Sequence, residues 1–181
     1  MWKQLRLVDD YPDPGDRPMA AVLAPLYEDE LGDIRVILTK RPDTMPTHAG
    51  HISFPGGRPD PGDDGPVGTA IREASEEVGI HAHQVEVLGF LPPIDTVEFS
   101  PLVIPVVARI ATPLNLVVSE LEVARVHTPR LDDLADPSRW AHVPWNGWKA
   151  WYYILDEDTL WGATAHMVRQ LVGLADGDID Q

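Results

Sequence analysis

The sequence contains no cysteine. Disulfide bonds, thiol nucleophiles and thiolate zinc sites are therefore excluded. Basic residues are also scarce, since 14 lysines and arginines stand against 29 acidic residues and the net charge is −15. We expect no non-specific binding of nucleic acid, because such binding depends on cationic contacts to phosphates. A small phosphorylated ligand is compatible with this charge if metal ions and a few arginines neutralise it locally.

Long apolar runs are missing too. The most apolar region, PLVIPVVARIATPLNLVV from Pro101, is interrupted by prolines and by Arg109. We therefore expect strands there, and no membrane partner. The first residues, MWKQLRLVDD, lack the apolar core of a signal peptide, which favours a cytoplasmic protein.

The length of 181 residues fits one domain with a substantial core. We assign residues 1–181 to that single domain. Within it, residues 1–18 are expected to form an N-terminal arm, either loose or packed, and residues 176–181 a frayed tail.

The order of the expected elements is mixed. Apolar alternation and turn residues predict strands at residues 19–29, 34–41, 84–93, 102–110 and 148–155, and a strand followed by a polar turn within 121–134. Helical periodicity predicts helices at about residues 67–78 and 159–175. The loop between residues 41 and 66 is rich in Pro, Gly and Asp, and loops of this length are usually functional or disordered. The chain is therefore expected to form an α/β or α+β sandwich.

One short stretch, REASEEVG from Arg72, concentrates negative charge. Glu73, Glu76 and Glu77 stand at i, i+3 and i+4, so a helix places them on one face. Like charges at this spacing destabilise a helix by roughly 0.2–0.5 kcal/mol per pair. A solvated acidic surface is one interpretation, and the spacing alone favours it. The alternative is a site for a hard divalent cation, which takes oxygen ligands and often substrate phosphates.

A family resemblance bears on this choice. The segment GGRPDPGDDGPVGTAIREASEEVGI resembles the Nudix box, whose core R-E-U-x-E-E-x-G-U, with U a bulky aliphatic residue, is matched from Arg72 to Ile80. Ala74 is small for the bulky position. Counted from Gly57, Asp63 occupies the position of a usual glutamate, and Arg72 arrives one residue late.

The preceding loop narrows the resemblance. ILTKRPDTMPTHAGHISFPGGRPDP, from Ile37 to Pro61, resembles the extended signature L-T-x-R, H-x-G and F-P-G-G of the Nudix subgroup that cleaves coenzyme A. The aspartate and the longer loop resemble the same subgroup, and LWGATAHMVRQL resembles its W-G-x-T-A helix. The resemblance implies a Nudix-like mixed β-sheet sandwiched between helices.

The implied reaction is metal-dependent hydrolysis of coenzyme A or acyl-CoA to 3′,5′-ADP and (acyl-)phosphopantetheine. The same chemistry on ADP-ribose, NADH or another nucleotide is an alternative. A third interpretation is a nucleotide-binding protein that has lost catalysis, which the intact glutamates argue against.

The resemblance also implies residue roles. Mg²⁺ or Mn²⁺ would be held by the carbonyl of Gly56 and by Glu73, Glu76 and Glu77. Glu73 and Glu76 would thereby belong to the catalytic set. Arg72 would orient a glutamate through a charge-assisted hydrogen bond, or would be a surface residue paired with Glu76.

Further roles fall on residues around this helix. Asp63 would brace the loop against the helix, or would simply be a turn or capping residue. A further carboxylate outside the box often serves as metal ligand or general base. Glu120 and Glu122 are the candidates, and we prefer Glu122, which forms an E-V pair with Val123 like that of many family members. An exposed strand glutamate is the alternative for Glu122.

Substrate charge requires cations as well. Arg41 is expected to contact phosphate, because its guanidinium offers a bidentate fork. Arg58 is a second candidate, with a solvated surface residue as an equal alternative. His48 is expected to contact substrate or to be structural.

The sequence has six tryptophans, of which Trp140, Trp145, Trp148 and Trp151 stand within twelve residues. Packing in the core or in a homodimer is the more ordinary use of such residues, and a stacking platform for an adenine ring is the alternative.

Overall fold

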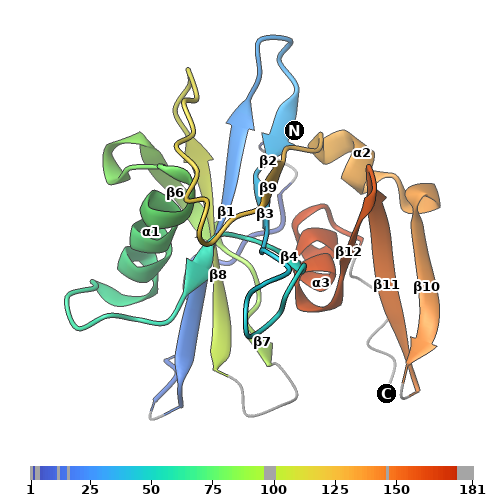
Figure 1. Cartoon of the computed structure of the whole chain (residues 1–181), viewed down its shortest axis with the longest axis horizontal. Coiled ribbons are helices and arrows are strands. Elements are labelled where there is room, and N and C mark those ends of the chain that lie inside the picture. Colours follow the sequence, from blue (N-terminus) through green and yellow to red (C-terminus); the bar gives the residue numbers. More distant parts are fainter. Residues whose placement is uncertain are drawn as a thin grey trace.

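The computed structural model describes residues 2, 5–11, 13–15, 17–95, 101–145 and 147–174. The predicted frayed tail, residues 176–181, lies outside this set. The described residues form a mixed α+β fold in which helices lie on both sides of a sheet, and the predicted fold class is thereby confirmed (Figure 1).

The largest sheet is built around two long, apolar strands. β1 (Met19–Glu28) and β8 (Leu102–Ile110) run parallel, with Met19 opposite Leu102 and Leu26 opposite Arg109. The middle of β1 and most of β8 are buried, as expected for parallel strands covered on both faces. The antiparallel strands of this sheet are β2 (Ile34–Val36) and β5 (Gly56–Gly57), which pair with β1, and β6 (Val85–Phe90) and β7 (Ile94–Asp95), which pair with β8.

Two smaller sheets complete the strand set. One has the order β4 (Ile52–Ser53), β3 (Leu38–Lys40), β9 (Arg125–His127). The other has the order β10 (Trp140–Trp145), β11 (Trp148–Leu155), β12 (Asp158–Trp161). All pairs in these two sheets are antiparallel.

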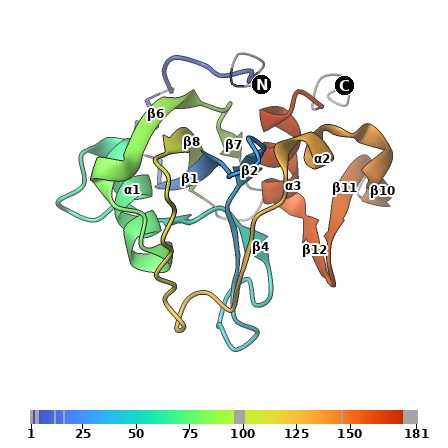
Figure 2. The same ribbon diagram turned by 90° about the horizontal axis from the view of Figure 1, so that it is seen from above.

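The helices divide the core into two parts. α1 (Gly65–Val78) lies on one side of β1 and β8, and α3 (Gly162–Leu171) lies on the other, between the central strands and the β10–β12 sheet (Figures 1 and 2). A short helix, α2 (Leu131–Ala135), joins β9 to β10, and single 3₁₀ turns form at Ala82–Gln84 and Pro137–Arg139. Ala70, Ala74 and Val78 of α1 are fully buried in one core cluster, and α3 contributes to the other. No helix in the described part of the chain is long and apolar enough to cross a bilayer.

The segment expected as one strand at residues 34–41 is divided, and this prediction was wrong in that respect. β2 ends at Val36, β3 begins at Leu38, and each belongs to a different sheet. The division falls at Ile37. Because Val36 pairs with Leu26 in the antiparallel register, Ile37 would face Pro25 of β1. Proline has no N–H to donate, so the ladder between the strands loses a hydrogen bond at this point.

Other boundaries also differ from expectation. The predicted helix at 159–175 contains β12 in its first residues, and α3 begins only at Gly162, whose φ of 66° permits the sharp change of direction. The region 121–134 has its strand at β9, and part of the expected polar turn is α2. β10 was not predicted. The strand expected at 84–93 ends at Phe90, and the helix expected from residue 67 begins at Gly65.

The described part of the N-terminal arm is packed on the domain. Val8 forms an antiparallel bridge with Phe90 of β6, with hydrogen bonds of 2.9 Å in both directions. Trp2, Leu5 and Leu7 pack against the core. Of the two predicted states of the arm, loose or packed, the described residues are in the packed one.

Candidate active site

The end of α1 fixes where its carboxylates point. Gly79 caps the helix in the left-handed conformation with φ 75°, and its N–H bonds to the carbonyls of Ala74 and Ser75. The buried face formed by Ala70, Ala74 and Val78 presses α1 onto the sheet. Glu73 and Glu77 are thereby turned toward β5, where Gly56 and Gly57 lie against β1.

Glu77 is a buried carboxylate, with only 7% of its surface exposed. The Gly56 N–H donates to its Oε1 at 3.3 Å, and the Thr39 hydroxyl donates to its Oε2 at 3.4 Å. Burial raises the pKa of Glu77 to about 7, and the charges of Glu73 and Glu122 act in the same direction. The solvated acidic surface, favoured by spacing alone, is therefore wrong for this residue.

Glu73 lies directly over β5. A Cβ added to Gly57 would clash with the carboxylate of Glu73, so a larger residue at this position would displace the Glu73 side chain. Burial raises the pKa of Glu73, although Arg72 opposes the shift, and Glu76 and Glu122 contribute to it. Glu76, with 54% of its side chain exposed, is the outermost carboxylate of the group.

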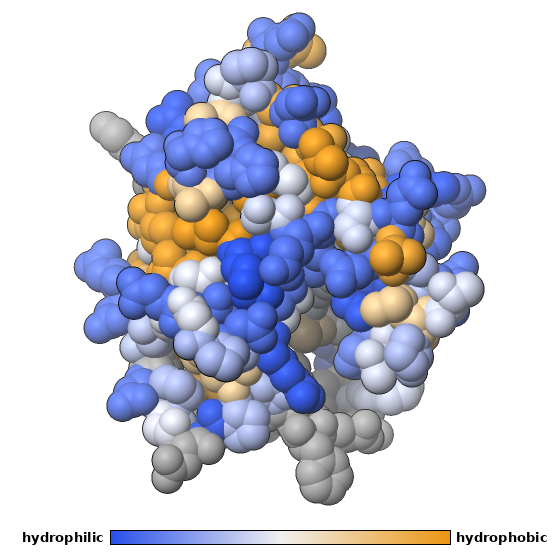
Figure 3. Space-filling model, turned by 60° about the vertical axis from the view of Figure 1, so that its left-hand side comes forward, coloured by the Kyte–Doolittle hydropathy of each residue, from blue (hydrophilic) through white to orange (hydrophobic). Residues whose placement is uncertain are grey.

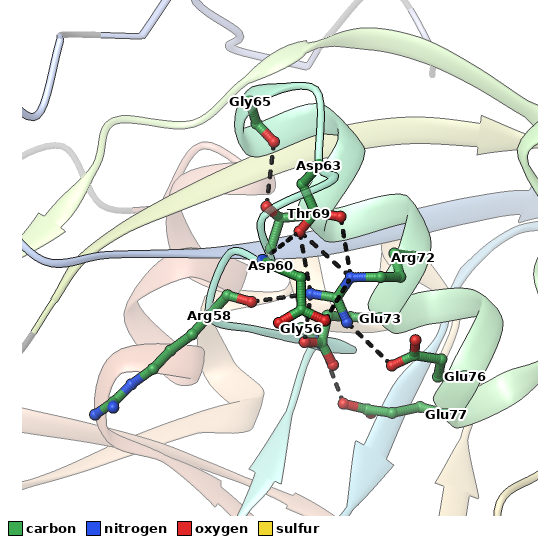
Figure 4. Close-up of polar contacts among 10 residues, drawn as sticks. All are labelled: Gly56, Arg58, Asp60, Asp63, Gly65, Thr69, Arg72, Glu73, Glu76 and Glu77. Carbon is green, nitrogen blue, oxygen red and sulfur yellow. Dashed lines mark hydrogen bonds and ion pairs between the residues drawn. The ribbon is translucent and has the colours of Figure 1, made fainter.

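Arg72 connects the loop to the glutamates (Figure 4). Its Nε donates to Asp63 Oδ1 at 3.0 Å, and its terminal nitrogens reach Glu76 Oε2 at 3.0 Å, Glu73 Oε1 at 3.0 Å and the Arg58 carbonyl at 2.9 Å. Arg72 lowers the pKa of Asp63 to about 2. The geometry therefore goes beyond a simple surface pair of Arg72 with Glu76, and Asp63 braces the loop against α1.

Glu120 and Glu122, the two candidate carboxylates outside α1, have different electrostatic surroundings. Both Glu120 and Glu122 are exposed in the turn before β9. The charge of Glu122 contributes to the raised pKa values of Glu73 and Glu77, so Glu122 lies within electrostatic range of both carboxylates. Glu120 is not among the causes of either shift. The structure therefore brings Glu122 to the group.

The three residues predicted to bind substrate differ in their position relative to the glutamates. The charge of Arg41 acts on Glu77, and its buried Nε has no hydrogen-bond partner among the described residues. The side chain of Arg58 points away from the glutamates in Figure 4, and only its carbonyl joins the network. His48 is exposed on the loop, with its ring centroid 5.4 Å from that of His51. The roles of Arg41, Arg58 and His48 on a substrate stay predictions.

The donor set suits a hard divalent cation. Glu73 and Glu77 are carboxylates whose ionised forms are disfavoured by burial and by neighbouring carboxylates, which is a condition that a bound cation relieves. Figure 3 shows hydrophilic residues gathered in the middle of the face on the α1 side, between hydrophobic areas. In the described part of the chain, no three acidic or histidine side chains already stand in a metal-holding arrangement. The fit therefore rests on donor chemistry, with Gly56, Glu73, Glu76 and Glu77 as the candidate ligands.

Sequence reasoning missed some residues of this region. Thr39 was seen only as part of a motif, yet it hydrogen-bonds the buried Glu77. His51 and Trp161 were given no role, although their rings meet next to the loop. Thr39 in β3 and Arg41, the residue after β3, stand two positions apart and so on one side of an extended chain, which could have indicated the first contact. Nothing in the local pattern indicates the second, because residues far apart in the sequence make it.

Comparisons with known proteins agree with this geometry. The family model for the NUDIX domain matches residues 17–146. A protein of Enterobacter sp. (strain 638), named uncharacterized Nudix hydrolase NudL, is 37% identical over 166 residues, which cover 86% of this chain and 82% of that protein. The NudL protein of Cronobacter sakazakii is 37% identical over 84% of this chain and 80% of its own length.

Solved structures resemble the fold. The binary complex of a C. elegans Ap4A hydrolase aligns with a TM-score of 0.53 and 27% identity, over 63% of this chain and 81% of that one. RenU, a Nudix hydrolase from M. smegmatis, aligns with a TM-score of 0.55 and 26% identity, over 66% of this chain and 74% of that one.

Proposed function

This chain belongs to the Nudix hydrolase family and is a pyrophosphohydrolase, and we propose that its substrate is coenzyme A or an acyl-CoA, cleaved to 3′,5′-ADP and (acyl-)phosphopantetheine. The observation that carries the substrate proposal is the loop before α1. It combines the LTKR, HAG and FPGG segments with the longer box. Its Asp63 binds Arg72 through both carboxylate oxygens, which supports a specialised loop rather than an arbitrary insertion.

Nudix hydrolases generally use divalent cations, and we propose Mg²⁺ or Mn²⁺ here. Glu73, Glu76, Glu77 and the Gly56 carbonyl would hold the cation. When bound, it would polarise the pyrophosphate and offset the charge that accumulates during hydrolysis.

The chain's own side chains would supply the remaining functions. Water attacks a phosphorus atom of the pyrophosphate, and Glu122 accepts the proton that this water loses. Arg72 keeps Glu73 and Glu76 oriented through its hydrogen bonds. Arg41, whose Nε is buried without a partner among the described residues, binds a phosphate oxygen.

Two further residues are proposed at the substrate. His48 and Arg58 would contact its outer parts, since both are exposed on the loop that leads to β5 and α1. Soluble coenzyme A as substrate also agrees with the cytoplasmic location expected from the sequence.

A substrate panel tests the proposal. The measurement is kcat/KM for coenzyme A, dephospho-coenzyme A, ADP-ribose and NADH at one Mg²⁺ concentration. Coenzyme A should exceed dephospho-coenzyme A by roughly tenfold to a hundredfold, because a charge-assisted hydrogen bond to the 3′-phosphate contributes about 1.5–3 kcal/mol. If ADP-ribose or NADH is preferred by about tenfold or more, the substrate proposal is wrong, while pyrophosphate hydrolysis by this family member still stands.

A further inference from the structure

An exposed tryptophan stands at the end of β12. Trp161 has 51% of its surface exposed, although it is one of the largest apolar side chains in the protein. Its ring centroid lies 4.8 Å from that of His51, and the two planes meet at 66°. In this edge contact one ring meets the face of the other, and much of the indole surface stays open to solvent. Such a surface can accept another flat ring by stacking.

The two aromatic rings continue the surface that holds the buried carboxylates. The Arg41 N–H donates to the His51 carbonyl at 2.9 Å, so His51 lies beside the end of β3. Two residues earlier on the same strand, Thr39 donates to Glu77. The charge of Arg41 acts on both Glu77 and His51. A ligand whose phosphates lie at Arg41 would therefore have its next group at His51 and Trp161.

The position of Trp161 is fixed by an ionic cluster on its own strand. Asp158, three residues earlier on β12, accepts from Lys40 Nζ at 2.7 Å and from Arg125 at 3.2 Å, and His127 Nε2 lies 3.0 Å away. Lys40 precedes Arg41 on the chain. The strand that carries the indole is thus tied to the strand that carries the phosphate-binding candidate, and the spacing between the two groups is set by the fold.

We propose that Trp161 and His51 form a subsite that binds the heteroaromatic base of the nucleotide substrate, with the base stacked on the indole ring and His51 at its edge. The proposal deepens the function proposed above, because it assigns the nucleoside half of the substrate to this side of the carboxylates. In this assignment both residues act on specificity and affinity rather than on the reacting phosphorus.

The chemistry of the subsite favours a base over a flexible aliphatic chain. The imidazole of His51 contacts the indole, and that of His48 lies with its centroid 5.4 Å from that of His51, so both supply polar groups that a base edge can use. Burial lowers the pKa of His51, and nearby His48 and Arg41 add to this effect. The neutral ring can therefore both donate and accept a hydrogen bond at neutral pH. An aliphatic chain would leave these polar groups without partners.

Binding of two matched, non-hydrolysable probes tests the proposal without turnover. The probes are α,β-methylene-ADP, which carries a base, and methylenediphosphonate, which does not, both measured by calorimetry with Mg²⁺. Trp161→Leu should weaken α,β-methylene-ADP about tenfold, since stacking of one base on an aromatic side chain contributes about 1–3 kcal/mol. Binding of methylenediphosphonate should not change, and Trp161→Phe should retain most of the affinity for α,β-methylene-ADP.

A control and a second variant make the outcome decisive. Trp145→Leu removes another exposed tryptophan of the same sheet, 67% exposed on β10, and should leave both probes unaffected. His51→Ala should weaken α,β-methylene-ADP selectively, and it tests the subsite if Trp161→Leu does not fold. Unchanged affinity in both subsite variants, or an equal loss for both probes, would overturn the proposal. A selective loss of affinity for 4′-phosphopantetheine would overturn it too, because that result would assign the phosphopantetheine half of the substrate to Trp161 and His51. Since no probe is cleaved, these results do not depend on the outcome of the substrate panel.

Discussion

At the scale of single residues, Glu77 determines the character of the site. Its carboxylate is buried between β3, β5 and α1, where it receives hydrogen bonds from Gly56 and Thr39. The raised pKa means that ionised Glu77 is less favourable in the folded protein than in the unfolded chain. The resulting loss of stability begins as the pH rises above the ordinary value of 4.5 and is complete above about 7. The cation site proposed above would offset this cost, because a bound cation favours the ionised forms of Glu77 and Glu73.

A comparison of Glu122 with Glu120 tests the assignment of the base. Glu122→Gln should lower kcat by at least about a hundredfold, because general-base catalysis contributes roughly 10²–10⁴-fold. Glu120→Gln, which removes an exposed glutamate two residues away, should leave kcat within about twofold of the wild type. The measurement is steady-state hydrolysis at saturating Mg²⁺ with the best substrate of the panel. Equal activity of the two variants would remove Glu122 from the catalytic set.

At the scale of elements, Arg72 braces the loop before α1 against the helix. The pKa of Asp63 is lowered to about 2 from an ordinary value of 3.8, chiefly by its hydrogen bonds from Arg72. A carboxyl with a lowered pKa in the folded state stabilises the protein above its unfolded pKa and loses this effect as the pH falls through the folded value. The brace is therefore fully present near neutral pH.

This linkage predicts a pH signature for Asp63→Asn. The difference in unfolding free energy between wild type and variant should be constant above about pH 5 and should shrink between about pH 4 and pH 2. Urea unfolding of the metal-free proteins at several pH values measures it. A difference that does not depend on pH in this window would show that Asp63 acts through shape or neutral hydrogen bonds only.

The contact between β3 and β12 is a second element-scale feature that can be tested. Asp158→Asn weakens the hydrogen bonds of Lys40, Arg125 and His127 at a buried position. Loss of a charged hydrogen-bond partner typically costs about 1.5–3 kcal/mol, so the unfolding free energy should fall by about 2 kcal/mol. Asp95→Asn disrupts an exposed pair with Arg17 and should cost less than about 1 kcal/mol. Similar losses in the two variants would mean that the cluster is no more than a surface network.

The accuracy with which the sequence predicted each helix and strand differed, for physical reasons. β8 was predicted with its observed bounds because its residues are mostly apolar and mostly buried. α1 was predicted to within two residues at its start and to the residue at its end, because Gly79 marks that end. β10 and α2 were not predicted, since short segments are stabilised by tertiary contacts rather than by local pattern. The turn from β12 into α3 was missed because the helical periodicity begins before the backbone becomes helical at Gly162.

At the scale of the whole molecule, the site lies where all three sheets and α1 meet. The family motif predicted which glutamates belong together, and the structure adds that Glu77 is buried while Glu76 is exposed. Spacing could not distinguish these two, because both lie on the same helical face and only the strands packed against that face decide which one is covered. The contact between Trp161 and His51 is equally a product of the complete fold.

The most direct test of the account is whether the folded protein gains a cation site from these carboxylates. The measurement is the melting temperature as a function of Mg²⁺ concentration at pH 8, for the wild type and for Glu77→Gln. For the wild type, a Mg²⁺ concentration a hundredfold above Kd should stabilise the fold by about 2.7 kcal/mol, which corresponds to a rise of roughly 5–10 °C. Without Mg²⁺, Glu77→Gln should melt no lower than the wild type, because a neutral amide avoids the cost of burying charge. It should respond little to Mg²⁺, since an amide is a weaker ligand than a carboxylate for a hard cation. A wild-type midpoint that does not move with Mg²⁺, or an equal rise in the variant, would contradict the account.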